Sequence, residues 1–173
     1  MPAAPTMNAR VTITATVLGE MQLQRALQGR IAATSDLSPA FAQIADNFVE
    51  GEEQVFAREG AYDGALPWAS LSPAYAAWKA RHYPGARILH ASGRLEDAMT
   101  GGAGSIREIE PLRLLMGGHV RVGNYDLGGI HQNPSPTNPL PQRKLINLGR
   151  RQRSRWVRYI LDHLRLEGRL QES

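Results

Sequence analysis

The chain has 173 residues, of which 42% are hydrophobic and 21% are charged. These values are typical of a globular domain and exclude wholesale disorder, a collagen-like repeat and a pure coiled coil. The absence of cysteine excludes a disulfide framework, a thiolate metal site and a cysteine nucleophile. The sequence has neither a signal peptide nor about 20 consecutive apolar residues, so we expect a non-secreted protein that does not contact a membrane.

The net charge of +4 is unevenly distributed along the chain. Residues 142–173 contain nine Lys or Arg and three Asp or Glu, a net charge of +6, whereas residues 1–141 carry a net charge of −2. Such asymmetry favours a polyanion or an acidic protein surface as a partner. The alternative interpretation is a helix with a solvated basic face.

The first third of the chain predicts a strand followed by two helices. We expect residues 1–10 to be a flexible arm and residues 11–173 to form one domain. Alternating β-branched residues predict a strand over 11–18, and apolar residues at helical spacing predict a helix over 20–33. A second helix over 38–59 begins with Ser38 as its N-cap and Pro39 as its first helical residue.

The second predicted helix carries a glutamate-rich face. We expect this face to be solvated, with a ligand-binding role as the alternative. The glutamates concerned are Glu50, Glu52, Glu53 and Glu59.

The middle of the chain predicts a loop, two short helices and antiparallel strands. Glycine and proline punctuate a loop over 60–73, after which Ser72 and Pro73 open a helix. A second short helix is predicted over 94–99. Period-two segments over 105–123 predict a β-meander or a pair of hairpins, and residues 125–132 predict a short helix or turn.

The C-terminal part predicts a proline-rich loop and a long basic helix. Four prolines over residues 133–141 indicate an extended or mobile loop. Helical spacing predicts a helix over 147–167 with arginines in its first half. Its predicted apolar stripe consists of Leu148, Trp156, Val157, Ile160, Leu161 and Leu164.

The motifs of common catalytic sites are absent from the sequence. The chain contains no phosphate-binding loop, dinucleotide-binding glycine motif, zincin motif or hydrolase nucleophile elbow. Its five histidines include no pair at i, i+3 or i, i+4, so we expect neither a metal nor a cofactor. One remaining alternative is a small hydrolase that uses His131 with Glu108 or Glu110.

Several short motifs follow one another in an order that resembles a known family. Residues 68–75 read Trp-Ala-Ser-Leu-Ser-Pro-Ala-Tyr and are followed by Lys79, and residues 88–95 read Ile-Leu-His-Ala-Ser-Gly-Arg-Leu. A Val-Arg-Val-Gly segment at 120–123, a His-Gln pair at 131–132 and a Pro-Gln-Arg segment at 141–143 complete the series. This order resembles the phage virion morphogenesis family, the tail-completion or head–tail joining proteins of Mu- and P2-like tailed phages.

The resemblance implies a fold and a function. The implied fold is α+β, with a small antiparallel β-sheet packed against helices and a long C-terminal helix, in agreement with the elements predicted above. The implied function is that of a non-enzymatic virion protein without cofactors, assembled in the host cytoplasm, that forms a ring at the head–tail junction. We expect a hexamer, with a dodecamer as the alternative, in contact with neck, connector and tail-tube proteins and with genomic DNA as a candidate ligand in the lumen.

Two groups of residues follow as candidates. The family motifs imply packing roles for Trp68, Leu71, Tyr75, Leu89, Gly93, Leu95, His131 and Gln132. Candidate inter-subunit or DNA-facing basic residues are Arg143, Lys144, Arg150, Arg151, Arg153 and Arg155. From the same arginines, a nucleic-acid-binding module is the alternative function.

Overall fold

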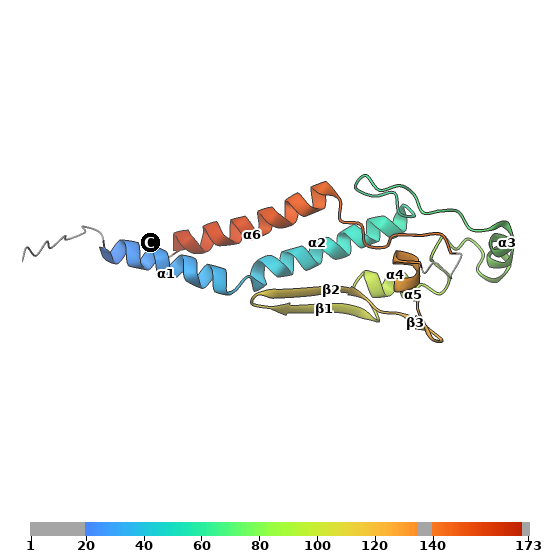
Figure 1. Cartoon of the computed structure of the whole chain (residues 1–173), viewed down its shortest axis with the longest axis horizontal. Helices are drawn as coiled ribbons and strands as arrows, with labels where there is room; N and C mark the ends of the chain where they lie inside the picture. Colours follow the sequence, from blue (N-terminus) through green and yellow to red (C-terminus); the bar gives the residue numbers. More distant parts are fainter. Residues whose placement is uncertain (1–19, 135–139, 171–173) are drawn as a thin grey trace, which may run out of the picture.

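Three long helices run along an elongated molecule (Figure 1). They are α1 (Glu20–Ser35), α2 (Ser38–Ala57) and α6 (Arg150–Leu170). Helix α6 runs back alongside α2 and α1, and the His163 ring bonds to the Asp36 carbonyl oxygen at 2.8 Å where α1 gives way to α2. The computed structural model describes residues 20–134 and 140–170. The predicted arm, the predicted strand over 11–18 and residues 135–139 of the proline-rich loop lie outside these residues.

Helix α2 begins at Ser38 itself, so the prediction of Ser38 as its N-cap was wrong. Leu37 occupies the N-cap position, and the Asp36 carboxylate accepts the Ser38 N–H at 2.9 Å. This contact satisfies one of the backbone donors that a helix N-terminus leaves free. The Ser38 side chain and, to a smaller extent, this backbone contact lower the pKa of the exposed Asp36 carboxyl.

The core lies between α2, the short helix α4 (Arg94–Met99) and the segments that carry Trp68, Val120 and Leu145. Helix α2 contributes apolar residues at spacings of three and four, as expected for a helix with one buried face. The buried core consists of Phe48, Val55, Phe56, Trp68, Leu95, Ala98, Met99, Val120 and Leu145.

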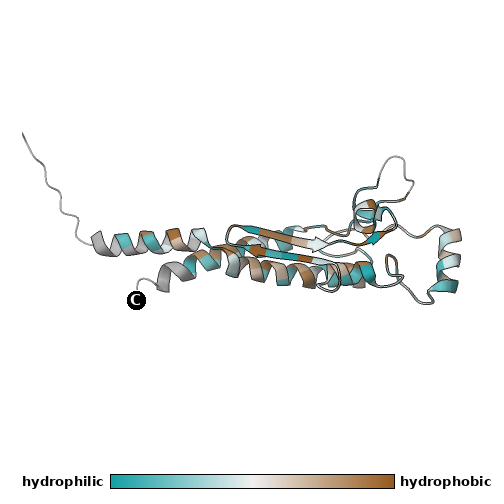
Figure 2. Cartoon of the chain, turned by 90° about the horizontal axis from the view of Figure 1, so that it is seen from below, coloured by the Kyte–Doolittle hydropathy of each residue, from teal (hydrophilic) through white to brown (hydrophobic). Residues whose placement is uncertain are grey.

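The strands form two separate antiparallel hairpins. In the first, β1 (Ser105–Glu110) pairs with β2 (Arg113–Gly118), with Glu110 opposite Arg113. Figure 2 shows both hydrophobic and hydrophilic residues on this hairpin, which packs on α2 and α4. The second consists of β3 (Arg121–Val122) and β4 (Tyr125–Asp126). Helices and small antiparallel sheets confirm the predicted α+β class.

Two further short helices complete the fold. Helix α3 (Pro73–His82) begins as predicted, because the Ser72 side chain accepts the Tyr75 N–H at 3.4 Å. It stands at one end of the molecule, beyond α4 and α5 (Leu127–Gln132) (Figures 1 and 2). Among the described residues, no helix is both long and apolar enough to cross a membrane.

The start of α6 depends on a close approach between Gly149 and Asp63. Helix α6 begins three residues later than predicted, and its Gln152 N–H donates to Asp63 Oδ2 at 3.2 Å. A Cβ atom at Gly149 would lie 1.9 Å from Asp63 Oδ2 and 2.3 Å from its Cγ. Because such separations are far below van der Waals contact, an alanine there must displace Asp63.

We therefore expect Gly149→Ala to lower the free energy of unfolding by about 2 kcal/mol, as crowded substitutions typically do. Asp63→Ala alone is expected to cost about 1 kcal/mol through loss of the cap. In the double variant, Gly149→Ala should add less to the cost of Asp63→Ala than it costs alone, because the carboxyl group is gone and only the Cβ atom of residue 63, 2.7 Å from the new one, still clashes. Urea denaturation of the four proteins measures this coupling, and additive effects would contradict it.

Candidate functional site

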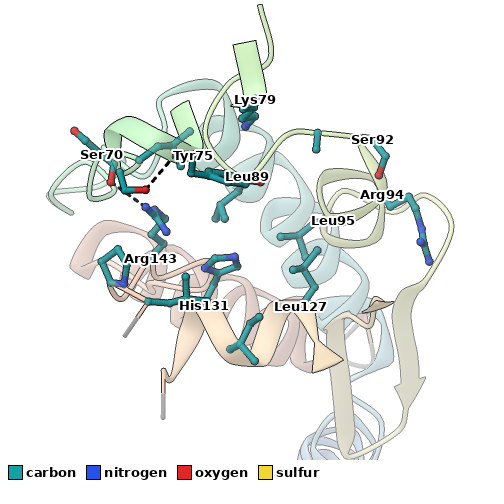
Figure 3. Close-up of a pocket in the computed structure, with 17 residues that line it drawn as sticks. Ser70, Tyr75, Lys79, Leu89, Ser92, Arg94, Leu95, Leu127, His131 and Arg143 are labelled. Carbon is teal, nitrogen blue, oxygen red and sulfur yellow. Dashed lines mark hydrogen bonds between the residues drawn. The ribbon is translucent and has the colours of Figure 1, made fainter. Parts of the chain in front are cut away.

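The motif residues converge on one cavity of about 670 Å³ (Figure 3). Its walls come from residues 70–72, helix α3, residues 89–95, helix α5 and residues 140–143. The predicted packing residues that line it are Leu71, Tyr75, Leu89, Gly93, Leu95 and His131. Trp68 and Gln132 do not line the cavity but hold one of its walls.

Trp68 anchors the wall formed by the segment after the proline-rich loop. Its ring is buried, meets Phe56 edge-on at 5.4 Å between centroids, and donates Nε1–H to the Lys144 carbonyl at 2.7 Å. Gly60, with φ of +92°, allows this packing, because a Cβ there would lie 2.5 Å from the indole. Trp68 therefore joins the loop after α2 to a segment 76 residues away.

The His-Gln pair of the motif fixes the same segment from the other side. Gln132 Oε1 accepts the N–H groups of Leu145 and Ile146 at 2.8 and 3.0 Å, and its Nε2 donates to the Ile146 carbonyl. The His131 carbonyl accepts the Arg143 N–H at 2.9 Å. The Gln132 side chain thus forms hydrogen bonds to the backbone of Leu145 and Ile146 like those that a neighbouring β-strand would form.

Arg143 is buried within its own chain, whereas an inter-subunit or DNA-facing role would place it on the surface. Only 4% of it is exposed, and its guanidinium donates to the carbonyl oxygens of Ala69 at 2.8 Å and Ser70 at 3.0 Å. Burial lowers the pKa of Arg143, opposed by nearby Tyr75. The guanidinium therefore holds the segment that contains Arg143 against the segment that contains Ala69 and Ser70.

Two other basic groups line the cavity near Arg143. Lys79 is 4% exposed and its ammonium donates to the Arg87 carbonyl. Burial lowers the pKa of Lys79, Glu59 opposes this shift, and Arg143 adds to it. Burial and Arg143 likewise lower the pKa of His131, whose Nδ1 is buried without a hydrogen-bond partner.

The apolar motif residues differ in their burial. Leu95 is buried, Leu71 and Leu89 are half-buried, and Tyr75 is 46% exposed. Gly93 takes a φ of +80° as the residue that precedes α4. This left-handed backbone turns the chain from residues 88–92 into the helix that carries Leu95.

The remaining candidate basic residues lie on the surface, at Lys144 and along α6. The arginines of the first half of α6 are exposed, and none of the carboxylates whose side chains the structure describes forms an ion pair with them. Two residues of the predicted apolar stripe, Val157 and Leu161, are also exposed, at 56% and 43%. The exposed arginines, which we call the arginine face, are Arg150, Arg151, Arg153, Arg155 and Arg158.

The prediction of a solvated acidic face on the helix over 38–59 was wrong at Glu52 and only partly right at Glu59, which follows the end of α2 at Ala57. Glu52 is only 3% exposed, and its Oε2 has no hydrogen-bond partner. Burial raises the pKa of Glu52 to about 8. Glu59 is half-buried and accepts the Ile88 N–H at 2.7 Å, whereas Glu50 and Glu53 are exposed as expected.

Neither carboxylate of the alternative hydrolase site approaches the histidine cavity. Glu108 and Glu110 lie on β1, where both pair with Arg113, at 2.9 and 3.2 Å. Neither lines the cavity that contains His131. No group of three or more metal-ligating side chains is found in the described part of the chain.

Comparison with known proteins gives one match. A model of the phage virion morphogenesis family matches residues 19–165, a range that includes α1 to α5, the cavity and the first three quarters of α6. Neither the curated proteins nor the solved structures contain a match.

Proposed function

The chain belongs to the phage virion morphogenesis family, and from this premise we propose that it forms a homo-oligomeric ring at the head–tail junction. Membership itself indicates a structural role in building the virion. The proposed ring, a hexamer or alternatively a dodecamer, joins the tail to the capsid connector and contacts neck and tail-tube proteins. Closure of a ring requires two different, complementary surfaces on each subunit.

The arginine face supports this proposal most directly. Five exposed arginines without carboxylate partners crowd the first half of α6, and the first turn contains no acidic residue. Positive charge near a helix N-terminus opposes the helix dipole by about 0.3 kcal/mol per residue or more. Within one subunit no described anion offsets this unfavourable interaction with the helix dipole, whereas an anionic surface on a neighbouring subunit would offset it.

The exposed side of α2 offers a surface of opposite charge. Asp46, Glu50 and Glu53 are exposed at positions spaced by four and three residues, so they share one side of the helix. Asp46 pairs with Arg107 at 2.7 Å. Glu50 and Glu53 form no ion pair with any described residue. We propose that this acidic stripe of one subunit meets the arginine face of the next.

The triple variant Arg150→Gln, Arg153→Gln, Arg155→Gln tests the proposed contact. We expect an unchanged or slightly raised melting temperature, because the helix dipole is no longer opposed. We also expect loss of the ring, measured as native mass by light scattering over a concentration series with and without tail extract. The matched control Arg165→Gln removes an α6 arginine that already pairs with Asp162. A triple variant that assembles normally and supports full virion yield would contradict the proposal.

The same arginine face favours a second candidate function, nucleic-acid binding. Five phosphate contacts would give a logarithmic salt dependence of duplex affinity with a slope of about −4 to −5. A monomer that ignores tail extract but binds duplex DNA with this slope would favour this alternative. Affinity without salt dependence, or no affinity at all, would exclude it.

A further inference from the structure

We propose that the cavity between α3, α4 and α5 is a binding site for a carboxylate carried on an apolar body. The cavity, of about 670 Å³, has the size of pockets that hold small ligands or several side chains. Its lining combines leucine side chains with a few convergent polar groups, and includes no acidic residue. This inference concerns a surface other than the arginine face and does not depend on ring formation.

The polar part of the lining is cationic. Lys79 and Arg143 are each 4% exposed, and Arg94 lies exposed at the rim. Lys79 and Arg143 donate to main-chain carbonyls and form no ion pair within the described residues, and only Glu59, which opposes the lowering of the Lys79 pKa, partly balances their charge. Uncompensated buried charge is costly, and a bound anion would offset that cost.

His131 supplies the second observation. Figure 3 places its ring between Arg143, Leu89 and Leu127, at the floor of the cavity. It is 91% buried, and its Nδ1 has no partner. Because an orphaned buried N–H is rare, we assign the proton of the neutral ring to Nε2. The ring can thus donate one hydrogen bond to an acceptor in the cavity.

The apolar part of the lining is built for a hydrocarbon body. Leu89, Leu95 and Leu127 line the cavity together with His131 (Figure 3). Tyr75 extends this surface beyond the cavity, because it stacks on Trp78 at 5.4 Å, and Trp78 stacks in turn on His82 at 4.4 Å. Tyr75 and Trp78 are 46% and 39% exposed. Such exposed aromatic residues commonly anchor partners.

The carboxylate can come from two sources, a free apolar acid or an acidic residue within an apolar peptide. For the first, sodium octanoate is titrated into the isotope-labelled protein, with octan-1-ol and octyltrimethylammonium as neutral and cationic controls. For the second, acetyl-Leu-Glu-Leu-amide is compared with acetyl-Leu-Gln-Leu-amide. NMR follows the methyl groups of Leu89 and Leu127 and the ring nitrogens of His131.

We expect octanoate or the glutamate peptide to bind at least ten times more tightly than its neutral counterpart and to raise the pKa of His131. Stronger binding of octanoate indicates a free acid, and stronger binding of the peptide indicates a protein partner. Equal binding of charged and neutral probes, a preference for the cation, or no shift at Leu89, Leu127 and His131 would overturn the proposal.

Two variants change the edge of the cavity and leave the hydrogen bonds of Lys79 and Arg143 in place, although Arg94→Gln also removes a long hydrogen bond, of 3.4 Å, to the Arg121 carbonyl. Ala91→Phe places a ring at the exposed edge of the cavity and is expected to abolish probe binding, whereas Ala103→Phe, an exposed position outside the lining, is its control. Arg94→Gln is expected to weaken octanoate binding three- to ten-fold and to leave octan-1-ol unaffected. Unchanged octanoate affinity in both Ala91→Phe and Arg94→Gln would place the probe elsewhere and overturn the assignment.

Discussion

Replacing Glu52 with glutamine is expected to raise the free energy of unfolding by about 5 kcal/mol at pH 9 and to leave it nearly unchanged at pH 4. Burial raises the pKa of Glu52 from 4.5 to about 8 in the folded protein. Between these values the folded state keeps a proton that the unfolded state releases. Stability therefore falls as pH rises from about 4.5 to about 8, and glutamine, which does not titrate, removes this loss.

The measurement is urea denaturation of both proteins at pH 4, 6, 7, 8 and 9, and the result of interest is their difference. Other titrating groups cancel in this difference because both proteins contain them. Glu53→Gln is the matched control, since Glu53 lies next in sequence on the same helix but is exposed. We expect that variant to differ from the parent by less than about 0.5 kcal/mol at every pH. A pH-independent effect of Glu52→Gln would show that Glu52 stays charged in the core.

The positions of the helices and the first hairpin were predictable because they depend on local patterns. Ser72 followed by Pro73 marks the start of α3, and Ile106 and Leu114 lie on alternating segments that became β1 and β2. The boundaries were less accurate where a distant residue sets them. Helix α6 starts at Arg150 because Asp63 and Gly149 meet there, which no local pattern reveals.

The helical spacing of the sequence indicates that Glu52 is buried, but its residue type, glutamate, favoured the opposite prediction. Glu52 lies four residues after Phe48 and four before Phe56, so all three share one face of α2. The prediction of a solvated acidic face followed the chemistry of glutamate instead of its position. Helical spacing alone would have placed this carboxyl in the core.

The convergence of the motifs on one cavity was not predictable in the same way. His131 and Leu89 are 42 residues apart, and only the packing of α5 against residues 89–95 brings them together. Arg143 is a similar case, since its acceptors on Ala69 and Ser70 are more than 70 residues away. A sequence pattern records that an arginine stands there but not which carbonyl groups it reaches.

Arg143→Met is therefore expected to destabilise the fold, whereas Arg155→Met is expected to weaken assembly without destabilising it. The methionine retains most of the apolar stem but removes the donors to Ala69 and Ser70, and two partly buried carbonyl oxygens lose their partner. Each hydrogen bond from a charged group contributes about 1.5 to 3 kcal/mol, and relief of the buried charge offsets part of this loss. We expect a net cost of about 3 kcal/mol.

Thermal and urea denaturation together with native mass separate the two roles. Arg143→Met should show a lower melting temperature and a loss of ring in proportion to the unfolded fraction. Arg155 is exposed and makes no ion pair within the described residues, so Arg155→Met should melt like the parent. A stable Arg143→Met protein that fails to assemble would show that Arg143 contacts a partner, as the sequence suggested. The structure argues against that outcome, because Arg143 is only 4% exposed and its guanidinium is held by the Ala69 and Ser70 carbonyls of its own chain.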